Sequence, residues 1–188
     1  MPTASPTMRY ADFQGGEAIV VSDMPRPEPA PGEAILRVSR TALCGSDFKL
    51  WHKGAAHVAG HEICGHVAQP GHPRDGQHCA VYIPEHCGTC STCRAGHTQM
   101  CTEVSSLIGW NRDGGYAEYL RVPDNCLMPV PDDIPLDLAP LLLDTIGTSA
   151  HAVREGRRVL ATQTPRVLVT GAGPVGLGVL LALRAMGQ

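Results

Sequence analysis

Hydrophobic and polar residues alternate in short runs over the first 130 positions, a pattern typical of β-strands rather than of long helices. The clearest alternation lies at residues 33–42, and a run rich in β-branched residues lies at 17–22. The 21 glycines and 16 prolines are spread along the chain and punctuate these runs. We therefore expect strands at 17–22, 33–42, 60–69, 79–84 and 116–122, with one short helical turn at 46–52.

The remaining segments predict connectors and then a change of architecture. Residues 1–7 read as a loose leader, the proline-rich stretch 24–32 as a connector, and 123–135 as a loop whose paired aspartates, Asp132 and Asp133, lie near a helix start. The mostly apolar stretch 136–154 predicts two helical pieces broken near Gly147. Continuous apolar residues at 166–170 predict a strand buried on both faces, followed by a helix at 177–186. We expect a domain boundary between about 144 and 165, and assign a first domain to 1–150 and the start of a second to 151–188.

Composition narrows the class of protein. The chain has 188 residues, which is enough for one ordinary domain and part of another. Its formal net charge of −3 gives no reason to expect nucleic acid as a partner. The N-terminus has no basic start with an apolar run, so we expect no signal peptide, no membrane span and a cytoplasmic location. In that reducing compartment, clustered cysteines are better read as metal ligands than as disulfides.

The most specific motif is a run of four cysteines. Two residues separate each of the first three, and seven precede the last: Cys87, Cys90, Cys93 and Cys101. Thiolates at this spacing can surround one small cation, and a closed tetrahedron of four is the usual structural zinc site. A disulfide-rich loop or unrelated core cysteines are the alternatives.

A second candidate metal site has a mixed set of ligands. Cys44 offers a thiolate, His61 an imidazole and Glu62 a carboxylate. Three protein ligands and one open position are what a catalytic zinc needs. Asp144 lies in an apolar stretch where an unpaired carboxylate is costly to bury, and we expect it to be a further ligand. A structural histidine at 61, and a helix cap or a surface ion pair at 144, are the alternatives.

A glycine-rich turn follows the predicted strand at 166–170. Gly171, Gly173 and Gly176, with Pro174 and Val175 between them, form a G-x-G-x-x-G motif that opens the last helix. This context predicts a dinucleotide site, in which the turn lets backbone approach the pyrophosphate at the helix N-terminus. The acidic residue expected about 20 positions later, which would distinguish NAD from NADP, falls beyond Gln188.

Together these motifs resemble the N-terminal half of a zinc-dependent medium-chain dehydrogenase/reductase of the alcohol and polyol dehydrogenase type. The matching segments are Cys44-Gly-Ser-Asp47, Gly60-His-Glu-x-x-Gly65, the cysteine run, Gly114-Gly-Tyr-Ala-Glu-Tyr119 and Gly171-Ala-Gly-Pro-Val-Gly176. The resemblance implies a mainly β catalytic domain, built as a GroES-like barrel with a zinc lobe, followed by the first β-α unit of a Rossmann domain. It also implies that both the Rossmann domain and the catalytic domain are incomplete in this chain.

The resemblance also assigns roles to residues. It implies that Cys44 and His61 ligate a catalytic zinc, with Glu62 as a ligand or an alternating partner and Asp144 where the family places a Cys, Asp or Glu ligand. Ser46 matches the hydroxyl that passes the substrate proton toward solvent, and the four-cysteine run matches the structural zinc lobe. One departure is Lys49, where the family often has a proton-relay histidine. The segment from Cys44 to His61 is also short, which alters one wall of the substrate cleft.

The resulting hypothesis is an oxidoreductase that carries two zinc ions and transfers hydride between an alcohol or polyol and NAD or NADP. A small-molecule substrate and a homo-oligomeric full-length protein are the expected partners. Two alternatives stay open: a zinc-stabilised binding module without catalysis, and a folded but inactive part of the dehydrogenase. The sequence does not distinguish a polyol from a sugar or a simple secondary alcohol.

Overall fold

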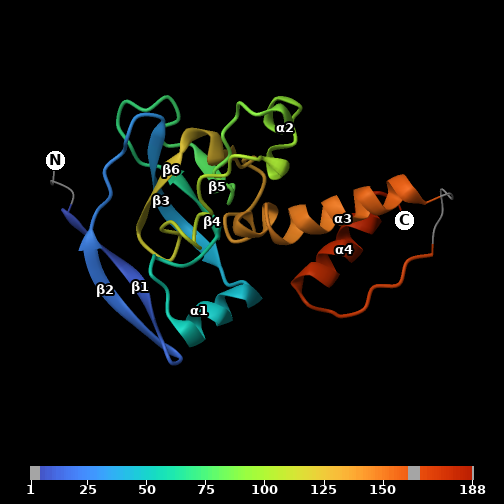
Figure 1. Cartoon of the computed structure of the whole chain (residues 1–188), viewed down its shortest axis with the longest axis horizontal. Coiled ribbons are helices and arrows are strands. Elements are labelled where there is room, and N and C mark those ends of the chain that lie inside the picture. Colours follow the sequence, from blue (N-terminus) through green and yellow to red (C-terminus); the bar gives the residue numbers. More distant parts are fainter. Residues whose placement is uncertain (1–4, 161–165, 188) are drawn as a thin grey trace. The chain divides into compact units, whose positions relative to one another are not determined.

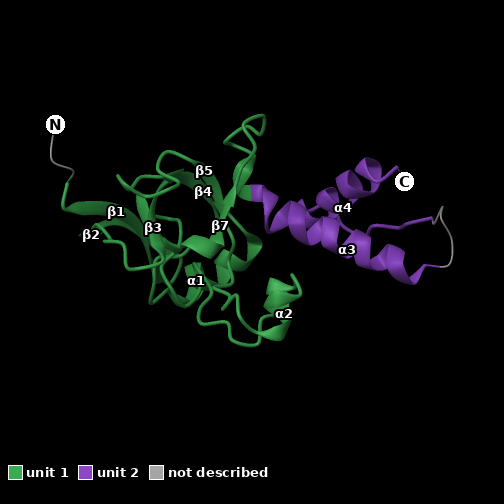
Figure 2. Cartoon of the chain, turned by 90° about the horizontal axis from the view of Figure 1, so that it is seen from above, with its two compact units in different colours: residues 1–140 green, residues 141–188 purple. Residues whose placement is uncertain are grey.

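The computed structural model describes residues 5–160 and 166–187, which form two compact units. The first unit comprises residues 1–140 and the second 141–188 (Figure 2). This division falls a few residues before the boundary expected from the sequence. The assignment of 151–188 to a Rossmann domain stays a prediction.

The first unit is organised around a five-stranded antiparallel sheet (Figure 1). The strand order is β6-β3-β4-β5-β7, so that β3 and β4 lie inside the sheet. The bounds are β3 Glu33–Ala42, β4 Glu62–Val67, β5 His78–Val81, β6 Tyr119–Pro123 and β7 Leu127–Pro129. The four strands expected in this region are confirmed, with β3 at the predicted bounds. The expectation of a loop throughout 123–135 is wrong, because β7 pairs there with β5.

The core of the first unit is formed by the inward positions of these strands. Leu36, Val67 and Val122 are completely buried, and Ile63 and Val81 nearly so. The near-continuous burial of β4 follows from its position at the centre of the sheet. Cys79 and Cys126 pack in the same core as small apolar side chains.

A separate hairpin precedes the sheet. Strand β1, Thr7–Gly15, pairs with β2, Ala18–Pro25, through a tight turn at Gly15 and Gly16, both with positive φ. Residues 1–4 of the leader predicted for 1–7 lie outside the described residues, and Thr7 already belongs to β1, a strand that the sequence analysis did not predict. Strand β2 extends into the expected connector. The short helical turn expected at 46–52 is confirmed as the 3-10 helix η1, Gly45–Asp47, and helix α1, Phe48–Lys53. Other short helices are α2, Ser91–Arg94, η2, Thr98–Met100, and η3, Asp124–Cys126.

Helices dominate the residues beyond 138. The 3-10 helix η4 covers Ala139–Leu142, α3 covers Thr145–Val159 and α4 covers Pro174–Ala185. The expected pair of helical pieces is confirmed, but their break lies at 143–144 rather than at Gly147, which is inside α3. The helix start expected near Asp132 and Asp133 is not observed, because the described residues 130–138 contain no helix. None of the described helices has the length and apolar character needed to cross a membrane.

The strand expected at 166–170 is not formed. These described residues belong to no strand or helix, and Leu168 is 87% exposed. A strand of a parallel sheet needs hydrogen-bonded neighbours on its edges, and the described chain supplies none here. Helices α3 and α4 pack on each other within the second unit, where a Cβ on Gly178 would lie 2.5 Å from the Ser149 hydroxyl oxygen. This contact explains why the packed face of α4 carries a glycine.

Candidate metal centres

The four-cysteine run folds into a compact cluster. The Sγ atoms of Cys87, Cys90, Cys93 and Cys101 all lie within 4.8 Å of one another. The separations are 4.0 Å for Cys87–Cys93, 4.0 Å for Cys90–Cys101 and 3.6 Å for Cys87–Cys101. A disulfide would hold two sulfurs about 2 Å apart, so this is not a disulfide cluster. Four thiolates about 2.3 Å from a zinc ion form a tetrahedron with edges of about 3.8 Å, which these separations match.

Backbone amides around the cluster favour thiolates. The amides of Thr89 and Cys90 donate to the Cys87 sulfur at 3.4 and 3.3 Å, and that of Glu103 donates to the Cys101 sulfur at 3.4 Å. A hydrogen bond with the Thr92 hydroxyl, helped by backbone amides, lowers the pKa of Cys90 to about 5. Burial and the adjacent sulfurs raise the pKa of Cys93 to about 12. Four thiolates together therefore require a cation, and the donor set fits zinc.

The second cluster is assembled by the pairing of β3 with β4. Ala42 at the end of β3 lies opposite Glu62 at the start of β4, so Cys44 and His61, just beyond these strand ends, meet at one edge of the sheet. The candidate ligand atoms of Cys44, His61 and Glu62 lie within 4.8 Å of one another. His61 and Glu62 are buried and Cys44 is half-buried. A soft thiolate, an imidazole and a carboxylate in one partly closed site fit a catalytic zinc.

Asp47 contacts the His61 ring of this cluster, a role that the sequence analysis did not assign. It is 1% exposed, and its Oδ1 lies 3.3 Å from Nδ1 of His61. Its other oxygen accepts hydrogen bonds from the Tyr116 hydroxyl at 2.7 Å and the Cys44 amide at 3.0 Å. Burial would raise the pKa of the Asp47 carboxyl, but the contact with His61 and the hydrogen bonds from Tyr116 and Cys44 lower it below its ordinary value. An ionised Asp47 can thus orient the His61 ring.

Glycines hold the backbone that carries His61. Gly60 has φ of +93°, and a Cβ there would lie 2.9 Å from the Tyr116 ring. A Cβ on Gly114 would lie 2.1 Å from the Gly60 carbonyl oxygen. The amides of Gly114 and Gly115 donate to the carbonyls of Val58 and Gly60 at 2.7 and 2.8 Å. Only residues without a side chain permit this close pairing, which explains the glycines of the two motifs that flank His61 and Tyr116.

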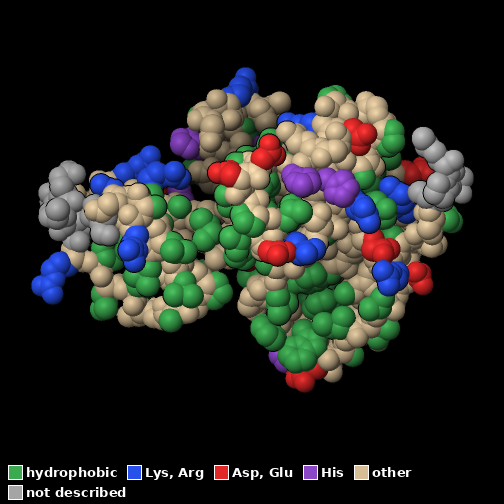
Figure 3. Space-filling model, turned by 180° about the vertical axis from the view of Figure 1, so that it is seen from behind, with side chains coloured by type: hydrophobic (Ala, Val, Ile, Leu, Met, Phe, Trp, Pro, Cys, Tyr) green, Lys and Arg blue, Asp and Glu red, His purple; other side chains and the backbone are tan. Residues whose placement is uncertain are grey.

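One tryptophan packs on the cluster and the other lines a hollow beside Asp47. The Trp110 ring packs on the His61 ring with centroids 5.3 Å apart. Trp51 and Phe48 of α1 line an apolar hollow of about 220 Å³ that also includes Asp47 and Leu43. Hydrophobic side chains gather over α1 and the β1–β2 hairpin (Figure 3). Ser46 is exposed, two residues beyond Cys44.

The remaining predicted site residues belong to the second unit. Asp144 is the N-cap residue of α3, and its carboxylate accepts a hydrogen bond from the Thr148 hydroxyl at 3.3 Å. Its role as a metal ligand stays a prediction. Gly173 is the N-cap of α4 and Pro174 its first residue, and a Cβ on Gly176 would lie 2.2 Å from the Gly171 carbonyl oxygen. This tight turn leads into α4, whose N-terminus carries no side-chain cap, as pyrophosphate binding requires.

The contact between Asp47 and His61 makes a prediction. Replacing Asp47→Asn removes the negative charge that fixes the imidazole while preserving its size. We expect zinc affinity at the Cys44 cluster to fall by roughly 10–100-fold, the usual cost of losing such a partner. Competition titration with a chelator of known affinity measures it. Asp137→Asn, at an exposed carboxylate paired with Arg40, is the matched control and should change nothing; equal affinity in both variants contradicts the role of Asp47.

Known proteins are similar to this chain in sequence and in fold. The alcohol dehydrogenase GroES-like domain family matches residues 30–132. L-Threonine 3-dehydrogenase of Rhizobium rhizogenes is 33% identical over 175 residues, covering 86% of this chain and 49% of that protein. L-Galactonate-5-dehydrogenase of Escherichia coli is 34% identical over 190 residues, covering 96% and 54%.

Solved structures of dehydrogenases and reductases have a similar fold. A cobalt and zinc bound thermostable alcohol dehydrogenase from Pyrobaculum aerophilum superposes with a TM-score of 0.83 at 29% identity, covering 96% of this chain and 57% of that one. Acetophenone reductase from Geotrichum candidum, in complex with NAD, has a TM-score of 0.83 at 27% identity, covering 98% and 57%.

The sheet and the matching family model define a GroES-like domain, and this domain carries two clusters of candidate metal ligands. The chain belongs to the zinc-dependent medium-chain dehydrogenase/reductase family. It spans about half the length of the curated relatives that it matches.

Proposed function

We propose that the complete protein is a zinc-dependent dehydrogenase that transfers hydride between an alcohol or polyol and NAD or NADP. The observation that carries this proposal is the mixed cluster of Cys44, His61 and Glu62, formed separately from a cluster of four thiols. A purely structural protein needs only the cluster of four thiols. The glycine turn at the start of α4 supports a nicotinamide dinucleotide as the hydride carrier.

The residues of the mixed cluster hold the metal. Cys44 and His61 are the proposed ligands, with Glu62 as a ligand or an alternating partner and Asp144 as a further ligand. A zinc ion bound there supplies Lewis acidity that lowers the pKa of an alcohol hydroxyl. Asp47 engages Nδ1 of His61 and so leaves Nε2 for the metal. Tyr116, whose pKa is raised by burial and by Asp47, stays protonated and donates to this carboxylate.

Ser46 is the proposed proton acceptor. Its position two residues beyond Cys44 places it next to the cluster along the chain, and its exposure connects it with solvent. A hydroxyl of this kind accepts a proton from the substrate and passes it outward. Lys49 occupies the position of the usual relay histidine, so we propose that the proton leaves from Ser46 to water.

Gly171, Gly173, Pro174, Val175 and Gly176 are the proposed binding residues for the dinucleotide. The backbone amides at the start of α4 are free of side-chain caps in the described residues and suit a pyrophosphate. We further propose a homo-oligomeric complete protein and a cytoplasmic location. The latter is supported by eight cysteines without a disulfide, all within the described residues.

A turnover assay of the complete, zinc-replete protein tests the function. We expect NAD or NADP to be reduced in the presence of polyols or secondary alcohols, and the Ser46→Ala variant to be slowed by about 10²–10⁴-fold, as for loss of a general base. Absence of turnover across polyols, sugar alcohols and simple secondary alcohols, in a protein that retains two zinc ions, would favour the binding module. The 188-residue chain alone should show no saturable cofactor binding if it is an inactive part of the enzyme.

A further inference from the structure

The four-cysteine lobe, residues 86–104, leaves the first unit through a narrow neck. At the neck, 83–85 pairs with 105–108: the Glu85 amide donates to the Ser106 carbonyl at 3.0 Å, and the Ile108 amide donates to the Ile83 carbonyl at 3.0 Å. Within the described residues 86–104, Cys93 is the one buried side chain. The lobe therefore has almost no apolar core of its own, and its attachment depends on the neck.

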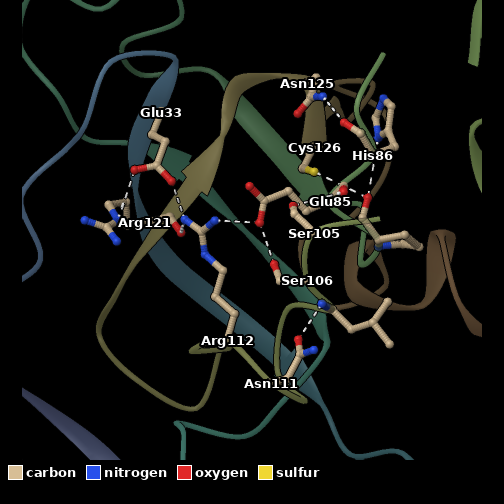
Figure 4. A network of polar contacts seen from close by, with 12 residues as sticks. Glu33, Glu85, His86, Ser105, Ser106, Asn111, Arg112, Arg121, Asn125 and Cys126 are labelled. Atoms are coloured by element: carbon tan, nitrogen blue, oxygen red, sulfur yellow. Dashed lines mark hydrogen bonds and ion pairs between the residues drawn. The ribbon is translucent and has the colours of Figure 1, made fainter. Parts of the chain in front are cut away.

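A network of charged side chains lies directly at this neck (Figure 4). The Arg112 guanidinium donates to Glu85 at 2.7 Å and, through its other terminal nitrogen, to Glu33 at the start of β3. The Glu85 oxygen that Arg112 contacts also accepts a hydrogen bond from the Ser106 hydroxyl on the opposite side of the neck. Arg112 thus connects β3 of the sheet with Glu85 on one segment of the neck and, through Glu85, with Ser106 on the other segment.

The burial of this network distinguishes it from surface ion pairs. The side chains of Glu33, Arg112 and Glu85 are 14%, 18% and 24% exposed. The pair between Arg9 and Glu118, by contrast, is 69% and 43% exposed. Removing one member of a largely buried group leaves a carboxylate without its partner, which is far more costly than breaking an exposed pair. The planar fork of arginine also reaches two carboxylates at once, which a lysine ammonium does not reproduce.

The segment that carries Arg112 is itself rigidly folded. The Gly109 amide donates to the Arg112 carbonyl at 2.9 Å, and the Leu107 amide donates to the Asn111 side chain at 2.6 Å. A Cβ on Gly109 would lie 2.4 Å from the Gly60 carbonyl oxygen, so this segment packs tightly on the loop that leads to His61 and β4. Arg112 is therefore held by the barrel and not by the lobe.

From this geometry we infer that Arg112 is a positioning residue for the four-cysteine site: it locks the neck to the barrel and slows release of the metal from the lobe. The inference rests on the proposed ligation of zinc by the four cysteines and deepens it. It predicts that Arg112 affects the rate of zinc loss more than it affects the stability of the barrel. No ligand atom changes, so faster zinc release cannot come from the loss of a ligand.

The test measures zinc release to a chromogenic chelator. Carrying Cys44→Ala in every protein confines zinc to the lobe. We expect Arg112→Met to release zinc at least tenfold faster than its parent, and Arg112→Lys to fall between them. Glu85→Gln, a milder change that keeps the size of the side chain, should also accelerate release. Arg121→Met is the matched control, because Arg121 contacts the same Glu33 at 3.0 Å but is 47% exposed and does not touch the neck. Its rate should stay within twofold of the parent.

A second measurement separates this role from general destabilisation. Leu36→Ala, in the core of the sheet, should lower the melting temperature without a comparable increase in zinc release. Parental release rates in both Arg112→Met and Glu85→Gln would overturn the inference, as would equal acceleration in Arg121→Met or Leu36→Ala. A Cys44→Ala parent that binds no zinc would overturn the four-cysteine ligation itself, and it is recognised before any Arg112 variant is compared.

Discussion

Replacing Cys44→Ala in the complete protein is expected to reduce turnover by at least about a thousandfold and to remove one zinc ion. Cys44 supplies the soft thiolate ligand of the mixed cluster, and its loss leaves His61 and the carboxylate with too little affinity to hold the metal. The Lewis acidity of the ion is worth several kcal/mol of transition-state stabilisation, and each 1.36 kcal/mol corresponds to about tenfold in rate.

His61→Ala should reproduce both effects. His57→Ala is the matched control, because His57 is exposed, lies four residues earlier and belongs to neither cluster; its turnover should be unchanged. Atomic absorption measures the metal and absorbance of the reduced nicotinamide measures the rate. Retention of turnover in Cys44→Ala with one zinc ion lost would remove this cluster from the mechanism.

The second large effect concerns the four-cysteine lobe. Cys90→Ser should release its zinc and unfold the lobe while the barrel keeps its structure, since the lobe has almost no buried apolar side chains and depends on the metal. Structural zinc contributes on the order of 10 kcal/mol to small metal-dependent folds. Arg94 is the one lysine or arginine in the lobe, and it lies at the end of α2, where its backbone is fixed by hydrogen bonds. We therefore expect trypsin to cleave after Arg94 at least tenfold faster in the variant.

Mass spectrometry of the limited digest identifies that cleavage and separates it from cleavage elsewhere. Ser91→Ala, at the adjacent exposed position in α2, is the control and should be cut no faster than the natural chain. Chelation of the natural protein should expose the same bond. Slow cleavage after Arg94 in the zinc-free lobe would mean that its fold does not depend on the metal.

The sequence predicted most of the sheet because its strands carry local signals. The strand at 33–42 alternates clearly, and its neighbours are separated by glycine and proline, so their positions follow from short-range pattern. Strand β7 was missed because it has three residues and pairs only through its contact with β5. The strand expected at 166–170 failed for a related reason: apolar composition indicates a buried strand, but pairing partners decide whether it forms.

The candidate sites could be predicted where ligand spacing is local. The four cysteines lie within 15 residues, and their sulfurs meet as expected. Cys44 and His61 meet because of the register between β3 and β4. The hydrophobic pattern alone did not predict this pairing; the family resemblance implied that the two residues share a metal. Asp47 stood in the quoted motif without a role, because its contacts with His61 and Tyr116 join segments far apart in the sequence. A carboxylate three residues after a ligand cysteine was the one signal that could have suggested it.

The central claim is that one polypeptide holds two zinc ions in chemically different sites. Its most direct test is the zinc content of the complete protein, measured beside that of Cys44→Ala, Cys90→Ser and the double variant after exhaustive dialysis. The account predicts two ions per chain for the natural protein, one for each single variant and none for the double variant. A single ion in the natural protein, or a single variant that loses both ions while its sheet remains folded, would contradict it.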